Sequence, residues 1–210
     1  MIVKSLNQKK DNILKDKCEK VSSIKEGEEI AVELFKELKN SETAGIGLSA
    51  NQIGINKRVC VVNVKEPIYL INPEIVERSD ESFVFLEGCL SFPNHYIKTM
   101  RHKRVVVKAD NFDDDLIFDV ESLSKEDNPA VDKTRDEIVT ECACIQHEID
   151  HLDGITMFDK KFVQKPVKRA YRKIGRNEKV LIKKDSQTKQ LKWKKAEPYM
   201  EDGWALVEIL

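Results

Sequence analysis

Two of the four histidines in this 210-residue chain, His147 and His151, lie four positions apart in the sequence. Residues with this spacing lie on one face of an α-helix, so both imidazoles could reach one metal ion. Glu148 follows the first histidine directly and would lie at the edge of that face, where it could handle a proton. The pattern predicts a metal-assisted hydrolase, but it supplies only two metal ligands.

The third ligand has several candidates, which are His95, His102, a carboxylate or one of the five cysteines. Cys89 is a good candidate because it follows Gly88 after a strand-like run, where the backbone can turn and present a thiol. A thiolate and two imidazoles leave one of four coordination positions for water, which is the pattern of a catalytic site. Spacing alone does not distinguish Cys89 from Cys60, so the ligand stays open at this point.

Helical periodicity places the two histidines near the end of a long helix over about residues 133–151. Ile138, Cys142 and Ile145 form its apolar stripe, and Gly154 follows as a stop signal. A second amphipathic helix is expected over residues 28–38.

The other expected elements are strands and loops. The strand-like runs are residues 58–64, 68–71, 82–86, 104–109 and 116–120, and the last two predict a hairpin. The small residues of 45–52 predict a flexible segment, and the polar residues 121–132 predict a loop. The apolar end, residues 204–210, could cover the core, add a strand or contact a second copy of the chain.

The composition is that of a globular chain without a strong overall charge. Apolar residues make up 40% of the chain, charged residues 35%, and the net charge is −1, so binding to DNA is not expected. No apolar run reaches the roughly 20 residues that a membrane span needs, and the N-terminus lacks a signal-peptide core. We therefore expect a cytoplasmic protein, in which the cysteines are free thiols.

Three segments of the sequence together resemble the motifs of the peptide deformylase family. They are GIGLSANQ at residues 45–52, EGCLS at residues 87–91 and QHEIDHLDG at residues 146–154. Each motif is suggestive by itself, and the combination is highly specific. The similarity extends over roughly residues 10–180. We therefore expect a catalytic domain over residues 1–185 and an extension of unknown role over residues 186–210.

The resemblance implies an α+β fold, in which antiparallel sheets pack around a central helix that bears the HExxH motif. It implies removal of the N-formyl group from the N-terminal methionine of newly made proteins, with release of formate. Cys89, His147 and His151 would bind one divalent metal. The family commonly works with Fe(II), which we expect here, and Zn, Ni or Co suit the same donors.

The resemblance also implies roles for other residues. Glu148 would transfer protons, while the side chain of Gln52 and the backbone N–H of Leu90 would stabilise the oxyanion. Positions that would bind the substrate are Gly45, Ile46, Gly47, Phe85, Gly88, Ala143 and Cys144. Residues that would orient the metal ligands through hydrogen bonds are Glu87, Arg101 and Asp150. His95 and His102 are expected on the surface.

Three other functions compete with this interpretation. A zinc endopeptidase with an HExxH motif usually takes its third ligand downstream, and no histidine lies downstream of His151. A non-catalytic binder of nascent chains would be expected to lack Glu148, Gln52 or a ligand. A structural metal site usually has four protein ligands, and only three are identified here.

A basic stretch precedes the C-terminal extension. Residues 160–184 contain eleven Lys or Arg and one acidic residue, Glu178. Such a stretch is most often a solvated face of the protein. By the resemblance, it could instead contact ribosomal RNA, which would place the protein near its N-formylmethionyl nascent peptides.

Overall fold

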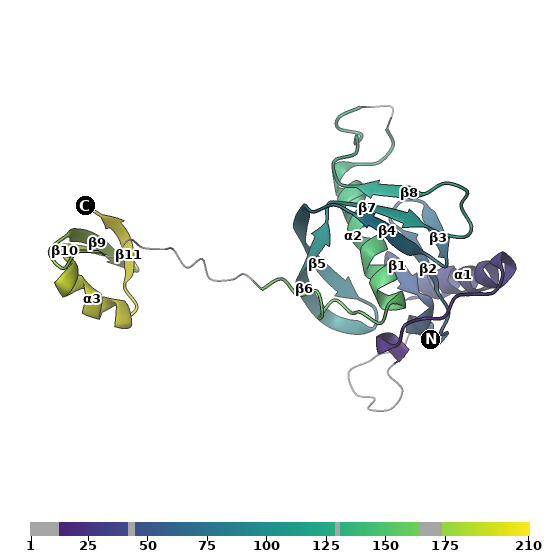
Figure 1. Cartoon of the computed structure of the whole chain (residues 1–210), viewed down its shortest axis with the longest axis horizontal. Helices are drawn as coiled ribbons and strands as arrows, with labels where there is room; N and C mark the ends of the chain where they lie inside the picture. Colours follow the sequence, from purple (N-terminus) through teal and green to yellow (C-terminus); the bar gives the residue numbers. More distant parts are fainter. Residues whose placement is uncertain (1–12, 42–44, 129–130, 164–173) are drawn as a thin grey trace. The chain divides into compact units, whose positions relative to one another are not determined.

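The computed structural model describes residues 13–41, 45–128, 131–163 and 174–210 (Figure 1). The chain divides into two compact units, Met1–Val163 and Gln164–Leu210, and each unit has its own hydrophobic core. No helix in these described ranges is long and apolar enough to cross a membrane.

Helix α2 (Arg135–Leu152) runs through the first unit between its sheets (Figure 1). A capping box fixes its start, because Thr134 accepts a hydrogen bond from the backbone N–H of Glu137 and donates its own N–H to the Glu137 carboxylate. Gly154 follows the helix with a φ of 73°, a conformation that favours glycine. Residues 141–152 are all buried, so both histidines are held inside the protein.

Three antiparallel sheets surround α2. The first has the order β1 (Gly47–Ser49), β2 (Val59–Asn63), β3 (Pro67–Ile71), and the second has the order β4 (Glu74–Arg78), β7 (Arg104–Lys108), β8 (Leu116–Asp119). The third is the hairpin of β5 (Ser82–Cys89) and β6 (Phe92–His102). Buried residues from the first two sheets pack against α2 and form the main core.

Strand β2 shows how the first sheet is covered on both faces. Cys60 and Val62 belong to the core around α2, whereas Val59 and Val61 pack with helix α1 (Ile24–Lys39). This alternation follows from the two-residue period of a strand. Two short 3-10 helices, η1 (Ile13–Lys15) and η2 (Ala50–Ile53), complete the described elements of this unit.

The second unit is a small three-stranded sheet with one helix. Its strands β9 (Lys179–Lys184), β10 (Gln187–Lys192) and β11 (Ala205–Ile209) have the antiparallel order β10-β9-β11. Helix α3 (Trp193–Glu201) contributes Ala196 to a core that also contains Val180 and Ile182.

The α+β fold with antiparallel sheets is confirmed, and both predicted helices of the first unit are found within a few residues of their expected bounds. The division of the chain differs from the expectation. It falls after residue 163, and not after residue 185, because β9 pairs with β10 and β11 of the tail. The apolar end of the chain adds a strand, β11. Strands β1, β4, β6, β9 and β10 were not predicted, and residues 45–52, which were expected to be flexible, contain β1 and most of η2.

Candidate metal and catalytic site

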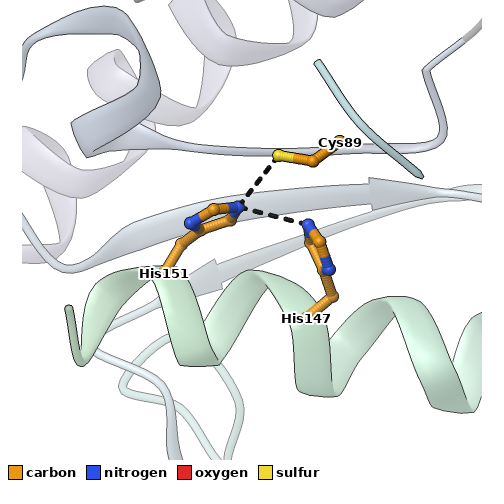
Figure 2. Close-up of side chains that lie close together, drawn as sticks. All are labelled: Cys89, His147 and His151. Atoms are coloured by element: carbon orange, nitrogen blue, oxygen red, sulfur yellow. Dashed lines mark hydrogen bonds between the residues drawn. The ribbon is translucent and has the colours of Figure 1, made fainter. Parts of the chain in front are cut away.

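Three side chains with metal-binding atoms meet where the end of β5 approaches α2 (Figure 2). They are Cys89 at the end of β5 and His147 and His151 on α2. Nε2 of His151 lies 3.2 Å from Sγ of Cys89 and 3.1 Å from Nε2 of His147. The donor atoms of the three residues all lie within 4.8 Å of one another. In the part of the chain that the structure describes, no other group of His, Cys, Asp or Glu has this geometry.

A break in the hairpin register turns Cys89 toward the helix. Gly88 lies opposite Tyr96, but Cys89 lies opposite Phe92, so the pairing shifts between the two residues. Such an irregularity bends a strand and re-aims a side chain. Cys89 is thereby placed against His147 and His151, which share one face of α2. Cys60, the other cysteine considered, is fully buried in the core.

The Glu148 carboxylate lies against β1. It accepts a hydrogen bond from the hydroxyl of Ser49, with 2.6 Å between Oγ and Oε2. A Cβ atom on Gly47 would overlap Oε1, so the glycine allows the close approach. Burial raises the pKa of Glu148, an effect that the nearby His147 and the Ser49 hydrogen bond partly offset. A raised pKa suits a carboxylate that takes up and releases a proton near neutral pH.

The Gln52 side chain is oriented at both ends. Its Oε1 accepts a hydrogen bond of 2.9 Å from the backbone N–H of Ser49, which leaves its NH₂ group to point the other way. That group donates to Oγ of Ser91 at 3.1 Å and lies 3.5 Å from Sγ of Cys89. The amide N–H donors of Gln52 therefore lie beside the candidate metal ligands.

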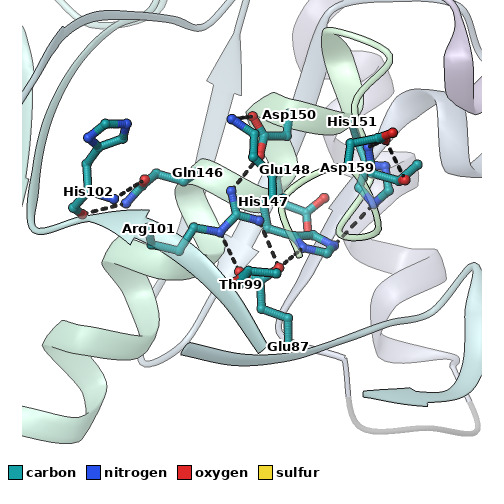
Figure 3. A network of polar contacts seen from close by, with 12 residues as sticks. Glu87, Thr99, Arg101, His102, Gln146, His147, Glu148, Asp150, His151 and Asp159 are labelled. Atoms are coloured by element: carbon teal, nitrogen blue, oxygen red, sulfur yellow. Dashed lines mark hydrogen bonds and ion pairs between the residues drawn. The ribbon is translucent and has the colours of Figure 1, made fainter. Parts of the chain in front are cut away.

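A buried ionic network supports His147 (Figure 3). Arg101 binds both oxygens of Glu87 and, at 2.5 Å, Oδ2 of Asp150. Oε2 of Glu87 lies 3.0 Å from Nδ1 of His147. Burial by itself would raise the pKa of Glu87, but the hydrogen bonds from Arg101 and His147 outweigh it and lower this pKa to about 2. Glu87 is therefore ionised at neutral pH and can accept the Nδ1–H of His147.

A cavity of about 370 Å³ opens beside these groups. All seven of the expected substrate-binding residues line it, and so do Gln52, Leu90 and Glu148. Sequence reasoning missed the residues that the hairpin contributes, which are Leu86, Phe92, Pro93, Asn94, His95 and Tyr96. The signal that would have found them is the pairing of β5 with β6, which depends on recognising β6 as a strand.

The other two histidines do not join the candidate metal ligands. His95 is half-buried where the hairpin lines the cavity, and its ring packs against Phe158 with 5.9 Å between ring centroids. His102 is half-buried, and its Nδ1 lies 2.7 Å from the backbone oxygen of Ser79.

Comparisons with known proteins agree on one family. The sequence model described as polypeptide deformylase matches residues 3–169. The peptide deformylase of Natranaerobius thermophilus is 40% identical over 164 residues, which cover 76% of this chain and 93% of the relative. That of Caldicellulosiruptor bescii is 35% identical over 164 residues, which cover 76% of this chain and 86% of the relative.

Solved structures give the same result for the fold. Peptide deformylase from Plasmodium falciparum matches with a TM-score of 0.61 and 28% identity, covering 77% of this chain and 86% of that one. The enzyme from Synechococcus elongatus, solved in complex with actinonin, matches with a TM-score of 0.58 and 28% identity, covering 74% of this chain and 76% of that one. The family match ends at residue 169, so β9, β10, α3 and β11 lie outside it.

Proposed function

This chain belongs to the polypeptide deformylase family, whose members are metal-dependent hydrolases that remove the N-formyl group from nascent peptides, and we propose which of its residues perform that reaction. The observation that carries the proposal is the meeting of Cys89, His147 and His151 beside Glu148. These residues come from two separate motifs, and Cys89, His147 and Glu148 line the same cavity. The formyl-methionyl end of a peptide would bind in that cavity.

We propose that Cys89, His147 and His151 bind one divalent metal. The donor set fits this role, because one sulfur and two Nε2 atoms crowd together while Nδ1 of His147 is directed to Glu87. Three such atoms in a largely buried site suit a cation that accepts their lone pairs. One thiolate and two imidazoles suit Fe(II), Zn, Ni and Co, and we propose Fe(II) as the native metal.

The chemistry that a bound divalent metal supplies at such a site is water activation, since the pKa of water falls from about 15.7 to roughly 7 in favourable cases. Glu148 is placed to accept the proton of the attacking water on its carboxylate and to deliver it to the nitrogen of the leaving amine. Its burial and its hydrogen bond from Ser49 support this role.

Attack on the formyl carbon places negative charge on the formyl oxygen. The NH₂ group of Gln52 lies beside Cys89, and we propose that it donates a hydrogen bond to this oxygen together with the backbone N–H of Leu90. Removing one such donor typically costs about 2.7–4 kcal/mol of transition-state stabilisation.

Recognition of the methionine side chain is assigned to the apolar part of the cavity. Ile46, Phe85, Ala143 and Cys144 line it next to His147. Ala143 and Cys144 lie one turn before His147 on α2, so the helix that would hold the metal also forms a wall of the cavity. Gly45, Gly47 and Gly88 line the same cavity and would let an extended peptide approach the backbone closely.

We further propose that this deformylase acts in the cytoplasm, close to the ribosome. The support is the excess of Lys and Arg in residues 160–184, since phosphate groups of RNA attract such a stretch. Residues 164–173 of this stretch lie outside the described part of the chain.

The test of the proposed function is formate release from a formyl-methionyl peptide by metal-loaded, anaerobically prepared protein. The wild type should release formate stoichiometrically with free amino termini, and Glu148→Ala should lose activity by about 100-fold or more. Absence of formate from the wild type would overturn the function, and full activity of Glu148→Ala would overturn the role of that residue.

A further inference from the structure

The hydroxyl of Ser49 holds the carboxylate of Glu148 from the first sheet. Oγ lies 2.6 Å from Oε2 and 2.9 Å from the backbone oxygen of the same residue, so its one proton is shared between two acceptors of Glu148. Both residues are buried, with 0% and 3% of their surface exposed. Among the described residues, no other side chain donates a hydrogen bond to this carboxylate.

The geometry of β1 explains why Ser49 is in this position. Residues two apart on a strand face the same side, so Gly47 and Ser49 both face α2, while Leu48 packs into the core next to α1. Gly47 has no side chain, and Oε1 of Glu148 fills the space that a Cβ atom would occupy. The carboxylate is thus held on one oxygen by contact with the backbone and on the other by a hydroxyl.

We propose that Ser49 is a positioning residue for the deformylation reaction, acting through Glu148. The hydrogen bond would fix the carboxylate in one orientation toward the candidate metal ligands. The carboxylate then loses little conformational entropy on the way to the transition state of proton transfer. This inference rests on the proposed role of Glu148 as the proton carrier. Ser49 itself does not line the cavity, so its effect should fall on turnover and not on substrate binding.

Ser49 also holds Gln52 through its backbone, and a replacement by alanine tests the hydroxyl group separately from that contact. Its backbone N–H holds Oε1 of Gln52 at 2.9 Å, and this contact persists in any variant other than proline. Ser49→Ala therefore removes the hydroxyl contact with Glu148 and keeps the backbone bond to the side chain of Gln52. It also removes the hydroxyl from the capping box of η2, where it faces the backbone N–H of Gln52, so a double-mutant cycle with Glu148 is needed to separate the two effects. Ser49→Cys nearly preserves the volume and offers only a weak donor, so it serves as a second variant if the alanine protein is unstable.

The experiment measures kcat and KM for a formyl-methionyl peptide, together with metal content, in a double-mutant cycle of Ser49→Ala and Glu148→Ala. Ser49→Ala should lower kcat about 10- to 100-fold, the range of a hydrogen bond to a charged group. KM and the metal content per chain should stay unchanged. In the Glu148→Ala background the same substitution should have no further effect on kcat.

A matched control is Ser124→Ala. Ser124 is also fully buried, and its hydroxyl donates to a carboxylate, that of Asp127, at 2.7 Å. It lies in the loop before α2, away from the residues that line the cavity, so kcat should be unchanged.

Two results would overturn the role of Ser49 while leaving the role of Glu148 intact, and in both of them Glu148→Ala is inactive. One is wild-type kcat in Ser49→Ala and Ser49→Cys. The other is a loss of kcat that is equally large in the presence and absence of the Glu148 carboxylate, because that loss would be structural. Wild-type kcat in Glu148→Ala would instead overturn the proposed role of Glu148 itself, and the inference would fall with it.

Discussion

Oε2 of Glu87 lies 3.0 Å from Nδ1 of His147, on the side of the imidazole ring that faces away from Cys89 and His151. The contact assigns the two ring nitrogens of His147 to different partners. Nδ1 donates to a carboxylate that Arg101 keeps ionised, and Nε2 faces the other two candidate ligands. Contacts of this kind orient a ligating imidazole and raise its basicity.

Glu87→Gln should therefore weaken metal binding. The amide keeps the shape of the side chain but loses the negative charge that stabilises the Nδ1–H, so the metal affinity should fall about 10- to 100-fold. Competition with a chelator of known affinity measures this change. Glu81→Gln is the control, since Glu81 is an exposed partner of Lys103. Equal affinities of Glu87→Gln and wild type would contradict the orienting role.

Arg101 should be needed for stability as well as for the site. It is 2% exposed and bonds two buried carboxylates, those of Glu87 and Asp150. Arg101→Met would leave Glu87 without its arginine and Asp150 with only the more distant Lys160, at 3.7 Å, and should lower the free energy of unfolding by about 3–5 kcal/mol. Urea denaturation of the metal-free protein measures it. Arg104→Met, which removes the more exposed pair with Glu77, should cost less than about 1 kcal/mol. Similar losses of unfolding free energy in both variants would show that the buried network stabilises the fold no more than a partly exposed ion pair does.

Only Cys89 should react with a thiol reagent in the folded, metal-free protein. Burial raises the pKa of Cys18 and of Cys142 to about 11, and it raises those of Cys60 and Cys144 well above their usual range. A raised pKa means that these thiols stay protonated at pH 8 and lack the reactive thiolate. Cys89 is the one cysteine that is partly exposed.

Mass spectrometry after brief treatment with iodoacetamide at pH 8 should find one modified residue, Cys89. A bound metal should protect it, because the sulfur would be a ligand. Modification of two or more cysteines in the native protein, or no protection by metal, would contradict the assignment.

Gly47→Ala should impair turnover more than Gly45→Ala. A methyl group on Gly47 would overlap the carboxylate of Glu148 and the sulfur of Cys144, whereas one on Gly45 would meet the flexible ends of Leu90 and Leu38. Displacement of a reacting group by about 1 Å can cost roughly 100-fold in rate, and kcat of Gly47→Ala should fall on that scale. Equal kcat values in the two variants would show that the carboxylate does not need this space.

The second unit should be dispensable for activity on small peptides. All residues proposed for the site lie between residues 45 and 151, within the first unit. A chain that lacks residues 174–210 should keep its kcat/KM for a formylated tripeptide within about twofold, since separate cores fold independently. A large loss would show that the second unit contributes to catalysis.

The sequence was most informative where chemistry is local. The spacing of His147, Glu148 and His151 predicted their common helix, and this helix is found at Arg135–Leu152. Glu87 and Asp150 were expected as partners of the ligating imidazoles, and Arg101 as a partner of Glu87. Glu87 does contact His147 and Arg101, whereas Asp150 contacts Arg101 in this network. These positions could be predicted because each belongs to a motif or lies at a typical distance from one.

Contacts between segments far apart in the chain were not predictable in the same way. Ser49 and Glu148 are 99 residues apart, and nothing in either segment indicates that a hydroxyl will meet the carboxylate. Strand β6 was missed because Pro93 and Asn94 interrupt its pattern, and with it the cavity position of His95 was missed. The second unit was missed because its core consists of a few apolar residues among many charges.

The most direct test of the proposed site is a titration of the metal-free protein with Fe(II) under anaerobic conditions, with formate release measured at each step. Activity should rise in proportion to added metal and level off at one metal per chain, and Cys89→Ser should fail to reach this level at the same metal concentrations. Full activity without metal, or unchanged metal stoichiometry and activity in Cys89→Ser, would contradict the assignment of Cys89, His147 and His151.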